Sequence, residues 1–417
     1  MQVLPSKLHG DITVPSSKSH TMRAILFASL ATGVSRITKY LPSPDTQAMI
    51  AACRLFGANI MQFPDSLEIT GVAGQPCFTD PYIHAGNSGQ VLRFIGAIAG
   101  LAEQKIVIDG DGSQRPIGPL IAGLRQFGCQ ANADNNYAPF TVQGKFSNNF
   151  ARICGMDSQP VSGLLIARAF AKDTTRLEVT NPGEKPWINL TLDWFERLGI
   201  ECIQHDFTHF HLPGFAKVLG FNYQVPGDFS SAAFPLVAAM LTRSNIMVHN
   251  LDMQDIQGDK KIVQILQAMG AEIEIDAVNK QLKVGVSNIL QGLEIDVNDI
   301  IDAIPILAVL GCFAQGTTRL TGAEIARNKE SNRLAVMCHE LKKLGANIHE
   351  LTDGLCIENS TLRTGAVNSH HDHRVAMSLA VAGLAIPGGV NITGSACIDK
   401  SFPEFVDKMR AIGANIV

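Results

Sequence analysis

The sequence predicts an α/β protein with two domains, each holding three related structural units. The first observation is a pattern that occurs six times: an amphipathic helix, then a large apolar residue followed by glycine, then a short β-type run. The second is its near-constant interval of about 70 residues, which is too long for a helical solenoid repeat. The third is the length of 417 residues, which exceeds the usual size of one domain. The recurring glycines are Gly57, Gly128, Gly199, Gly270, Gly345 and Gly413.

Each recurring glycine is expected to end a helix. The residue just past a helix often adopts the left-handed conformation, which glycine accepts without steric penalty. The segments RLFGANI at Gly57 and KKLGANI at Gly345 fit this interpretation. A helix–glycine–strand order is common in α/β proteins, but its near-constant spacing over six copies favours a true repeat.

Two segments rich in proline, glycine and serine are the best candidates for crossings between domains. They lie near residues 14–19 and 225–230. Crossings there would give one domain formed by residues 1–17 together with 229–417, and a second domain formed by residues 18–228.

The composition is that of an ordinary globular protein with enough apolar mass for large cores. Hydrophobic residues make up 46% of the chain, charged residues make up 17%, and the formal net charge is −4. A protein that binds nucleic acid usually carries a basic footprint, so we expect no nucleic-acid partner. An anionic substrate would therefore need a local basic pocket.

The cysteines and the apolar segments predict a cytoplasmic protein. The nine cysteines are scattered and odd in number, and none forms a C-x-x-C pair, which favours free thiols in a reducing compartment. The N-terminus has no apolar core typical of a signal peptide. The longest apolar runs, at 232–241 and 304–314, are too short to span a bilayer, so we expect no membrane association.

Basic residues recur on turns of small residues that lead into predicted helices. Helix N-termini attract anions through unpaired N–H groups and the positive end of the helix dipole. Lys18 and Arg23 follow such a turn, Arg93 follows the turn GNSG, and Arg115 precedes a helix that Pro116 would start. One such segment alone is most simply a solvated basic residue or a helix cap. Several together predict loops that converge on one anionic site, and a later group adds Arg327, Lys329, Glu330, Arg333, Asp372, His373, Arg374 and Lys400.

A specific set of segments runs in order along essentially the whole chain. The segments are SKSHTMR, PDTQAM, GNSGQVLR, RPIGPLIAGLR, SQPVSGLL, KPWINLTL, VPGDFSSAAF, DIQGD, NDIIDAIP, RNKESNRL, DHRVAM and KSFPEF. In combination they resemble the EPSP synthase family, within the wider group of enolpyruvyl transferases. The resemblance implies a two-domain inverse α/β barrel of six βαβαββ repeats, three per domain, with the active site in the cleft between the domains.

The same resemblance implies a transferase of the shikimate pathway of aromatic amino acid biosynthesis. Such an enzyme moves the carboxyvinyl group of phosphoenolpyruvate to a hydroxyl of shikimate 3-phosphate and releases phosphate. It implies small-molecule substrates, no cofactor and no metal, and we expect a monomer. The run HHDH suggests a metal in isolation, but histidine-rich turns are more often simply exposed.

The residues that match the family's phosphoenolpyruvate site are all present. Phosphoenolpyruvate carries a carboxylate and a phosphate; arginine binds such groups through two-point contacts, and lysine supplies a compact charge. The matching residues are Lys18, Gly89, Arg115, Gln159, Arg333, Arg374 and Lys400.

Acid–base roles follow from the same resemblance. Asp302 matches the carboxylate that takes the proton of the acceptor hydroxyl. Glu330 and Lys18 match groups near the vinyl methylene, where a proton arrives and later leaves. His373 is expected to orient a neighbour.

The acceptor side departs from the family pattern. The implied acceptor-binding residues are Ser19, Arg23, Asp157, Ser158, Gln159, Glu184, Trp187, Asp302 and Lys329. Asp157 and Glu184 stand where the family has serines that hold the acceptor's phosphate, and Trp187 replaces a stacking tyrosine. Carboxylates facing a phosphate would repel it. Either they turn away, or a cation bridges them, or the acceptor lacks that phosphate, unless the alignment is shifted by one residue.

Three functions therefore stay open. The leading one is the family reaction with shikimate 3-phosphate, and the second is the same chemistry on a different acceptor. The third is a binding protein without catalysis, which the presence of Asp302, Glu330, Lys18 and Lys400 argues against. The sister enzyme, which acts on UDP-N-acetylglucosamine, carries a reactive cysteine in the loop that here reads GDGSQRPIG, and this loop has none.

Overall fold

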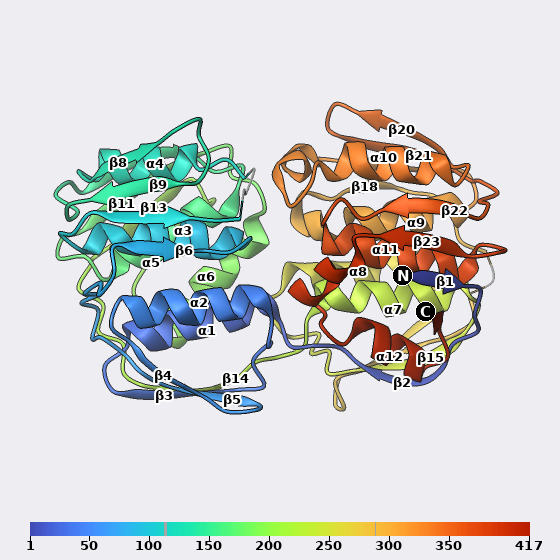
Figure 1. The fold of residues 1–417 in the computed structure, drawn as a ribbon, viewed down its shortest axis with the longest axis horizontal. Helices are drawn as coiled ribbons and strands as arrows, with labels where there is room; N and C mark the ends of the chain where they lie inside the picture. Colours follow the sequence, from blue (N-terminus) through green and yellow to red (C-terminus); the bar gives the residue numbers. More distant parts are fainter. Residues whose placement is uncertain (112–114, 288) are drawn as a thin grey trace. The chain divides into compact units, whose positions relative to one another are not determined.

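The computed structural model describes residues 1–111, 115–287 and 289–417. The chain folds into two compact units. Unit 1 comprises Met1–Ser16 and Pro226–Val417, and unit 2 comprises Ser17–Val225. Both ends of the chain therefore belong to unit 1, as Figure 1 shows by the labels N and C. The predicted loop GDGSQRPIG falls partly outside the described residues.

Six four-stranded sheets make up the β structure, three in each unit. In every sheet one parallel pair of strands is followed by two antiparallel neighbours. The helices and sheets together form βαβαββ repeats, so the predicted sixfold repeat is confirmed. The strand orders are β14-β3-β5-β4, β6-β7-β9-β8 and β10-β11-β13-β12 in unit 2, and β2-β15-β17-β16, β18-β19-β21-β20 and β22-β23-β1-β24 in unit 1.

The elements of unit 2 alternate regularly along the chain. Its helices are α1 (Lys18–Leu30), α2 (Pro44–Leu55), α3 (Gly89–Ile98), η1 (Ala99–Leu101), α4 (Gly118–Gln126), α5 (Ser158–Ala169) and α6 (Lys185–Arg197). Its strands are β3 (Val34–Thr38), β4 (Asn59–Gln62), β5 (Ser66–Thr70), β6 (Tyr82–His84), β7 (Ile106–Asp109), β8 (Gln130–Ala133), β9 (Phe140–Gln143), β10 (Phe150–Cys154), β11 (Thr175–Thr180), β12 (Ile203–His205), β13 (His209–Leu212) and β14 (Asn222–Gln224).

Unit 1 repeats the scheme with both ends of the chain built into its sheets. Its helices are α7 (Phe229–Leu241), η2 (Gly258–Lys260), α8 (Lys261–Ala268), η3 (Asn298–Ala303), α9 (Ile304–Phe313), η4 (Glu324–Asn328), α10 (Arg333–Lys343), α11 (His373–Ala385), η5 (Ser395–Lys400) and α12 (Phe405–Ala411). Its strands are β1 (Gln2–Leu4), β2 (His9–Thr13), β15 (Asn245–His249), β16 (Ile273–Asp276), β17 (Gln281–Val284), β18 (Glu294–Asp296), β19 (Thr317–Thr321), β20 (Asn347–Leu351), β21 (Gly354–Glu358), β22 (Gly365–Asn368), β23 (Val390–Thr393) and β24 (Asn415–Ile416).

The six recurring glycines end helices as predicted. Each is the second residue after the end of its helix, in the order α2, α4, α6, α8, α10 and α12. All six have positive φ, from 68° at Gly199 to 109° at Gly57. A residue with a Cβ is strained in this conformation, so glycine allows the chain to turn directly into the next strand.

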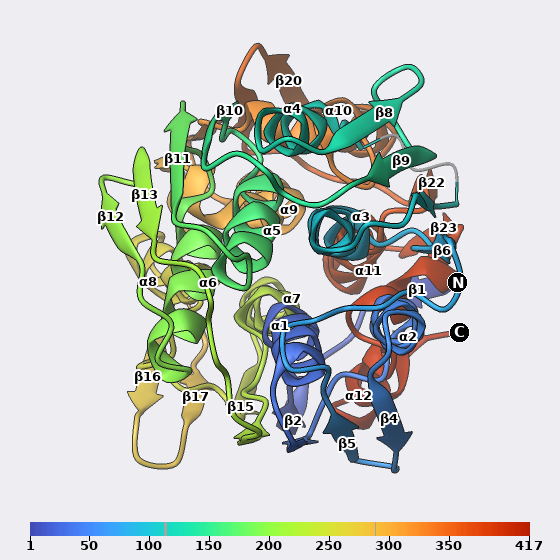
Figure 2. The same ribbon diagram turned by 90° about the vertical axis from the view of Figure 1, so that its left-hand side faces the viewer.

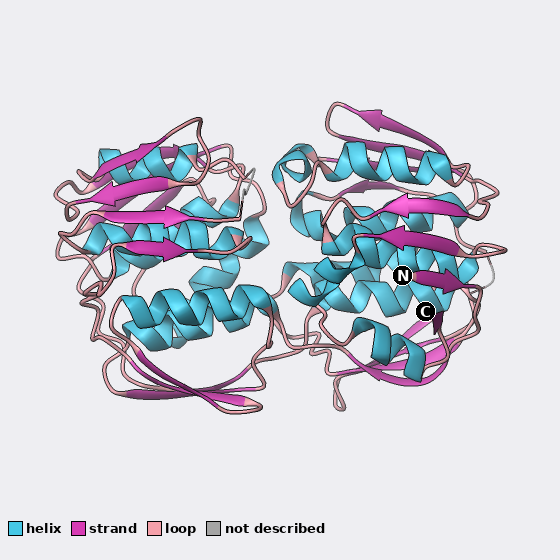
Figure 3. Ribbon diagram, viewed as in Figure 1, coloured by secondary structure: helices cyan, strands magenta, loops and turns pink. Residues whose placement is uncertain are grey.

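Helices lie inside each unit and the sheets lie around them. In unit 2 all ten residues of α3 are buried, and α3 packs against α5. In unit 1 the apolar helices α7, α9 and α11 pack against one another. Figures 2 and 3 show the strands on the outside of these helices. Because the innermost helices are buried on all sides, their chemistry is confined to their ends.

Within the described residues, no helix is both long enough and apolar enough to cross a membrane. All nine cysteines are free thiols, which agrees with the expected lack of a disulfide framework. Burial raises the pKa of several of them, to about 12 at Cys53 and at Cys312, so these thiols are unreactive.

Candidate active site

In unit 2, the N-termini of the inner helices carry the residues singled out from the sequence. Ser17 caps α1, Ser88 caps α3 and Asp157 caps α5, each by accepting a backbone N–H of the first turn. Such caps satisfy donors that have no partner inside the helix. The first residues of the three helices are Lys18, Gly89 and Ser158.

Gly89 lies at a point of close approach. A Cβ atom at this position would come within 2.9 Å of Gln159 Oε1 and 3.1 Å of Arg115 Cδ. It would also lie 3.1 Å from Arg93 Nη1. Glycine is therefore required for packing, and three of the predicted phosphoenolpyruvate-binding residues, Gly89, Arg115 and Gln159, are brought together here.

The two arginines at this point make different contacts. Arg115 is buried, and its Nη1 donates to the side-chain oxygen of Asn87 at 2.8 Å and to the Asn87 carbonyl at 3.1 Å. Arg93 Nη2 donates to the Pro116 carbonyl at 2.9 Å and pairs with Asp157 Oδ2 at 3.1 Å. Asn87 thus orients Arg115 through neutral oxygens, whereas a carboxylate balances the charge of Arg93.

Asp157 and Glu184 are the two departures from the family pattern. Both accept hydrogen bonds from residues at the start of α5. Asp157 Oδ1 accepts from the Gln159 N–H at 3.0 Å, and its other oxygen pairs with Arg93. Glu184 is buried, has a left-handed backbone with φ of 48°, and accepts from Ser158 N at 3.2 Å and Ser158 Oγ at 3.3 Å. Arg93 is therefore a cation beside Asp157, and Glu184 engages both donors of Ser158.

Arg23 contacts several of the remaining predicted site residues of unit 2. It is buried, and it donates to Thr191 Oγ1 at 3.0 Å, to the Ser19 carbonyl at 3.2 Å and to the Trp187 carbonyl at 3.0 Å. Burial lowers the pKa of Arg23. Lys18 Nζ pairs with the buried Asp45 at 3.3 Å. The structure thus brings Ser19, Arg23 and Trp187 together, while Lys18 is held by α2.

In unit 1, Arg333 is the centre of a carboxylate network. It begins α10 and is fully buried. Its Nε pairs with Asp372 at 2.8 Å, its Nη1 with Asp302 at 2.7 Å and its Nη2 with Glu330 at 2.8 Å. Although burial opposes the charged form, these carboxylates outweigh it and raise the pKa of Arg333. The buried guanidinium is stable here only because it is fully paired.

Asp302 lies between two guanidinium groups. Its Oδ1 accepts from Arg333, and its Oδ2 pairs with Arg374 Nη2 at 2.8 Å. Burial alone would raise the pKa of Asp302, but Arg374, Arg333 and Lys329 together hold it below its ordinary value. Arg374 also has a buried Nη1 without a hydrogen-bond partner in the part of the chain that the structure describes. This donor is available to an anion.

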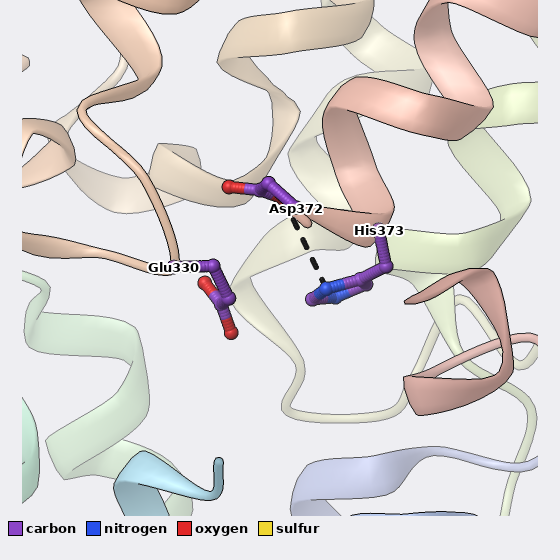
Figure 4. Close-up of side chains that lie close together, drawn as sticks. All are labelled: Glu330, Asp372 and His373. Atoms are coloured by element: carbon purple, nitrogen blue, oxygen red, sulfur yellow. Dashed lines mark ion pairs between the residues drawn. The ribbon is translucent and has the colours of Figure 1, made fainter. Parts of the chain in front are cut away.

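Glu330, Asp372 and His373 lie close together (Figure 4). Their potential ligand atoms lie within 4.8 Å of one another. However, Glu330 pairs with Lys400 at 3.1 Å as well as with Arg333, and Asp372 also caps α11 through the Arg374 N–H. Since cationic side chains already balance both carboxylates, we interpret the cluster as an ion-pair network.

Several site residues escaped prediction from the sequence. Arg93 and Asp45 stand in two of the family-like segments, GNSGQVLR and PDTQAM, but the sequence indicated no role for Asp45 and none specific to Arg93. Asn87 orients Arg115, and Asp259 is a buried carboxylate in the segment DIQGD. A charged residue inside an otherwise apolar helix start was the available signal for Arg93; no comparable signal marked Asp259.

Comparison with known proteins gives one consistent result. The family model described as EPSP synthase (3-phosphoshikimate 1-carboxyvinyltransferase) matches residues 4–409. The chain belongs to the EPSP synthase family. The predicted family, and the expectation of a transferase, are thereby confirmed.

Individual members of the EPSP synthase family match over nearly their whole length. The 3-phosphoshikimate 1-carboxyvinyltransferase of Chlamydia pneumoniae is 42% identical over 423 residues, covering 100% of this chain and 94% of the relative. That of Acetivibrio thermocellus is 40% identical, covering 100% and 99%. A solved EPSP synthase from Acinetobacter baumannii superimposes with a TM-score of 0.82 at 28% identity, covering 99% of this chain and 98% of that one. The chain thus has the two-domain inside-out α/β fold of the family.

Proposed function

We propose that this chain catalyses the reaction for which its family is named. In that reaction the carboxyvinyl group of phosphoenolpyruvate is transferred to a hydroxyl of shikimate 3-phosphate, and phosphate is released. The full-length family match carries the proposal. Supporting it, the chain presents basic residues at helix starts in both units and a buried acid–base network in unit 1.

Seven residues are proposed to bind phosphoenolpyruvate. The proposed set is Lys18, Gly89, Arg115 and Gln159 from unit 2, with Arg333, Arg374 and Lys400 from unit 1. Arg115 and the buried Nη1 of Arg374 offer charge-assisted donors to its carboxylate and phosphate. Gly89 leaves the space in which Arg115 and Gln159 approach each other.

Asp302 is proposed as the base that removes the proton from the acceptor hydroxyl. While Arg374 and Arg333 lower its pKa, Asp302 is a weak base. An arriving anion competes for these guanidinium groups. We infer that substrate binding strengthens Asp302 as a base by weakening its two ion pairs, so that deprotonation is coupled to occupancy of the site.

Glu330 and Lys18 are proposed to exchange protons with the vinyl methylene carbon of phosphoenolpyruvate. Addition of the acceptor oxygen at C2 of phosphoenolpyruvate requires a proton at C3, and elimination of phosphate then removes a proton from C3. Glu330 is held by Lys400 at 3.1 Å and by Arg333, which keeps a carboxylate oriented for this exchange. His373 is buried next to Asp372 at 3.9 Å and would orient it.

The acceptor would lie against Ser19, Arg23, Ser158, Gln159, Trp187, Asp302 and Lys329. A second candidate acceptor, one without a phosphate at this position, is favoured by a single observation. Glu184 engages both donors of Ser158, the residue that the family resemblance assigns to phosphate. A phosphate would have to displace this carboxylate, whereas a neutral or cationic group would not.

The test is release of inorganic phosphate from phosphoenolpyruvate with each of several acceptors. Shikimate 3-phosphate, shikimate and a panel of other hydroxyl compounds would be compared, with acceptor-free reactions as background. Turnover with shikimate 3-phosphate above all others supports the first proposal. A preference for a non-phosphorylated compound supports the second, and no turnover with any acceptor supports a binding protein without catalysis.

We further propose a cytoplasmic monomer that needs neither cofactor nor metal. The proposed structural domains are residues 1–17 with 229–417, and residues 18–228. Support comes from the free cysteines and from the fact that each unit has its own buried helices and its own three sheets. Sedimentation analysis and activity after treatment with a chelator test these points.

A further inference from the structure

Asp259 is a buried carboxylate to which neither the family motifs nor the mechanism assigns a role. It lies on η2 and is 2% exposed. The hydroxyl of Ser230 donates to its Oδ2, while its buried Oδ1 has no hydrogen-bond partner among the residues described. An unsatisfied buried oxygen on a charged group is costly. A proton on Asp259 would remove most of that cost.

Asp259 lies on an element that packs against the element carrying Asp302. Helix η2 packs against η3, which carries Asp302, and against α7, whose N-terminus carries Ser230. Burial raises the pKa of Asp259 to about 7, and Asp302 and Asp228 contribute in the same direction. Arg374 and the Ser230 hydrogen bond oppose them. Both members of the Asp302–Arg374 pair therefore influence the charge of Asp259, and the packing of η2 against η3 keeps Asp259 near Asp302.

The other charged groups around η2 are engaged elsewhere. Lys260 Nζ donates to the carbonyls of Met253 and Asp255, at 3.2 and 2.8 Å. Lys261 of α8 lies 3.8 Å from the exposed Asp299 of η3. Neither lysine contributes an ion pair to Asp259, so Arg374 is the cation that opposes its charge.

We propose that Asp259 is a positioning residue whose proton controls how Arg374 is shared between Asp302 and the anionic substrate. This inference rests on the proposed function. When Asp259 is neutral, Arg374 pairs with Asp302 and can also bind an arriving anion. When Asp259 is ionised, it competes with Asp302 and the substrate for Arg374 and adds a negative charge near Asp302. Binding of phosphoenolpyruvate is therefore favoured by the protonated form.

The first experiment compares the pH dependence of kcat/KM for phosphoenolpyruvate in wild type and Asp259→Asn. Asparagine keeps the shape and the contact with Ser230 but does not titrate. Wild type should lose kcat/KM above pH 7, approaching about tenfold per pH unit, mainly through KM. Asp259→Asn should lack this loss, apart from ionisation of the substrate itself. Asp299→Asn, on the same element as Asp302 but with a side chain that is 44% exposed, should keep the wild-type profile.

The second experiment needs no substrate, so it remains informative even if the proposed reaction is wrong. A carboxyl group with a raised pKa in the folded state contributes stability that is lost as pH rises from its unfolded value, about 4, through about 7. The melting temperature of Asp259→Asn relative to wild type should therefore increase between pH 4 and 8. Ser230→Ala removes the hydrogen bond that opposes the shift, so it should move the wild-type kinetic transition to higher pH.

Two results would overturn the proposal. One is an Asp259→Asn variant whose kcat/KM follows the same pH profile as wild type. The other is a melting-temperature difference that does not change with pH, which would mean that Asp259 is ionised throughout. A uniform loss of activity with a uniformly lower melting temperature would show a purely structural role. Absence of turnover with shikimate 3-phosphate in wild type would count against the proposed function alone.

Discussion

The two units use their cations differently. In unit 2, Arg115 and Arg23 donate to neutral oxygens of amide, hydroxyl and carbonyl groups. In unit 1, Arg333 alone pairs with three carboxylates, and Lys400 pairs with one of them. Unit 2 thus holds Arg115 and Arg23 through neutral contacts, although Asp157 and Asp45 balance the charges of Arg93 and Lys18, whereas in unit 1 the carboxylates around Arg333 are balanced by cations. The first arrangement suits binding of an anion, and the second suits proton transfer.

Asp302→Asn should have the largest effect on activity and the clearest contrast between binding and chemistry. The amide cannot accept a proton, so kcat should fall by about 10²–10⁴-fold, the usual contribution of general acid–base catalysis. KM for phosphoenolpyruvate should change little, because the substitution frees Arg374 and Arg333 rather than removing them. Steady-state measurement of kcat and of the KM for phosphoenolpyruvate tests this prediction. An equal loss in binding would show that Asp302 is structural.

Arg333→Met should have the largest effect on stability. It leaves Asp302, Glu330 and Asp372 without their shared partner, and breaking a buried ion pair costs about 3–5 kcal/mol. Urea unfolding at neutral pH measures the change. Lys283→Met is the matched control, since its pair with Glu274 is exposed and is expected to contribute at most about 1 kcal/mol. Similar losses in both variants would refute a special role for the network.

Arg115→Ala should separate binding from stability in unit 2. Arg115 donates to Asn87, a neutral amide, whereas Arg333 pairs with three carboxylates, so the cost in unfolding free energy should be smaller than for Arg333. Phosphoenolpyruvate binding should weaken by about 2–5 kcal/mol if Arg115 contacts the substrate while buried. The exposed Arg152→Ala serves as control. Unchanged binding in Arg115→Ala would remove it from the site.

Local rules account for what the sequence predicted. The glycines after α2 and α10 were predictable because a helix end needs a left-handed residue whatever its surroundings. Lys18 and Gly89 were located because helix starts carry recognisable caps. The family resemblance supplied the roles, and the comparisons confirmed the family itself.

Long-range contacts explain the features that the sequence did not predict. The pair of Arg93 with Asp157 joins residues 64 positions apart, and nothing local in either segment encodes it. The burial of Asp259 depends on the packing of η2 against η3 and α7. The left-handed backbone of Glu184 departs from the usual preference of a residue with a side chain. Each depends on the assembled fold.

The carboxylates at the start of α5 lead to the prediction with the smallest expected effect. The double change Asp157→Ser with Glu184→Ser should improve the use of shikimate 3-phosphate if its phosphate binds near Ser158. Serine is a good helix cap, so α5 should keep its first turn. Each repulsion removed is worth about 1–4 kcal/mol at intermediate dielectric, and the gain appears in kcat/KM for the acceptor.

The contacts divide this gain unequally between the two positions. Asp157 is already neutralised by Arg93 at 3.1 Å, so Asp157→Ser alone should gain little and would remove the carboxylate beside Arg93. Glu184 holds both donors of Ser158, so Glu184→Ser should supply most of the improvement. Because both side chains act on one phosphate, their effects should not add independently. The exposed Glu201→Ser is the control. If wild type already uses shikimate 3-phosphate efficiently and Glu184→Ser is worse, then Glu184 supports the acceptor site and the second candidate acceptor is wrong.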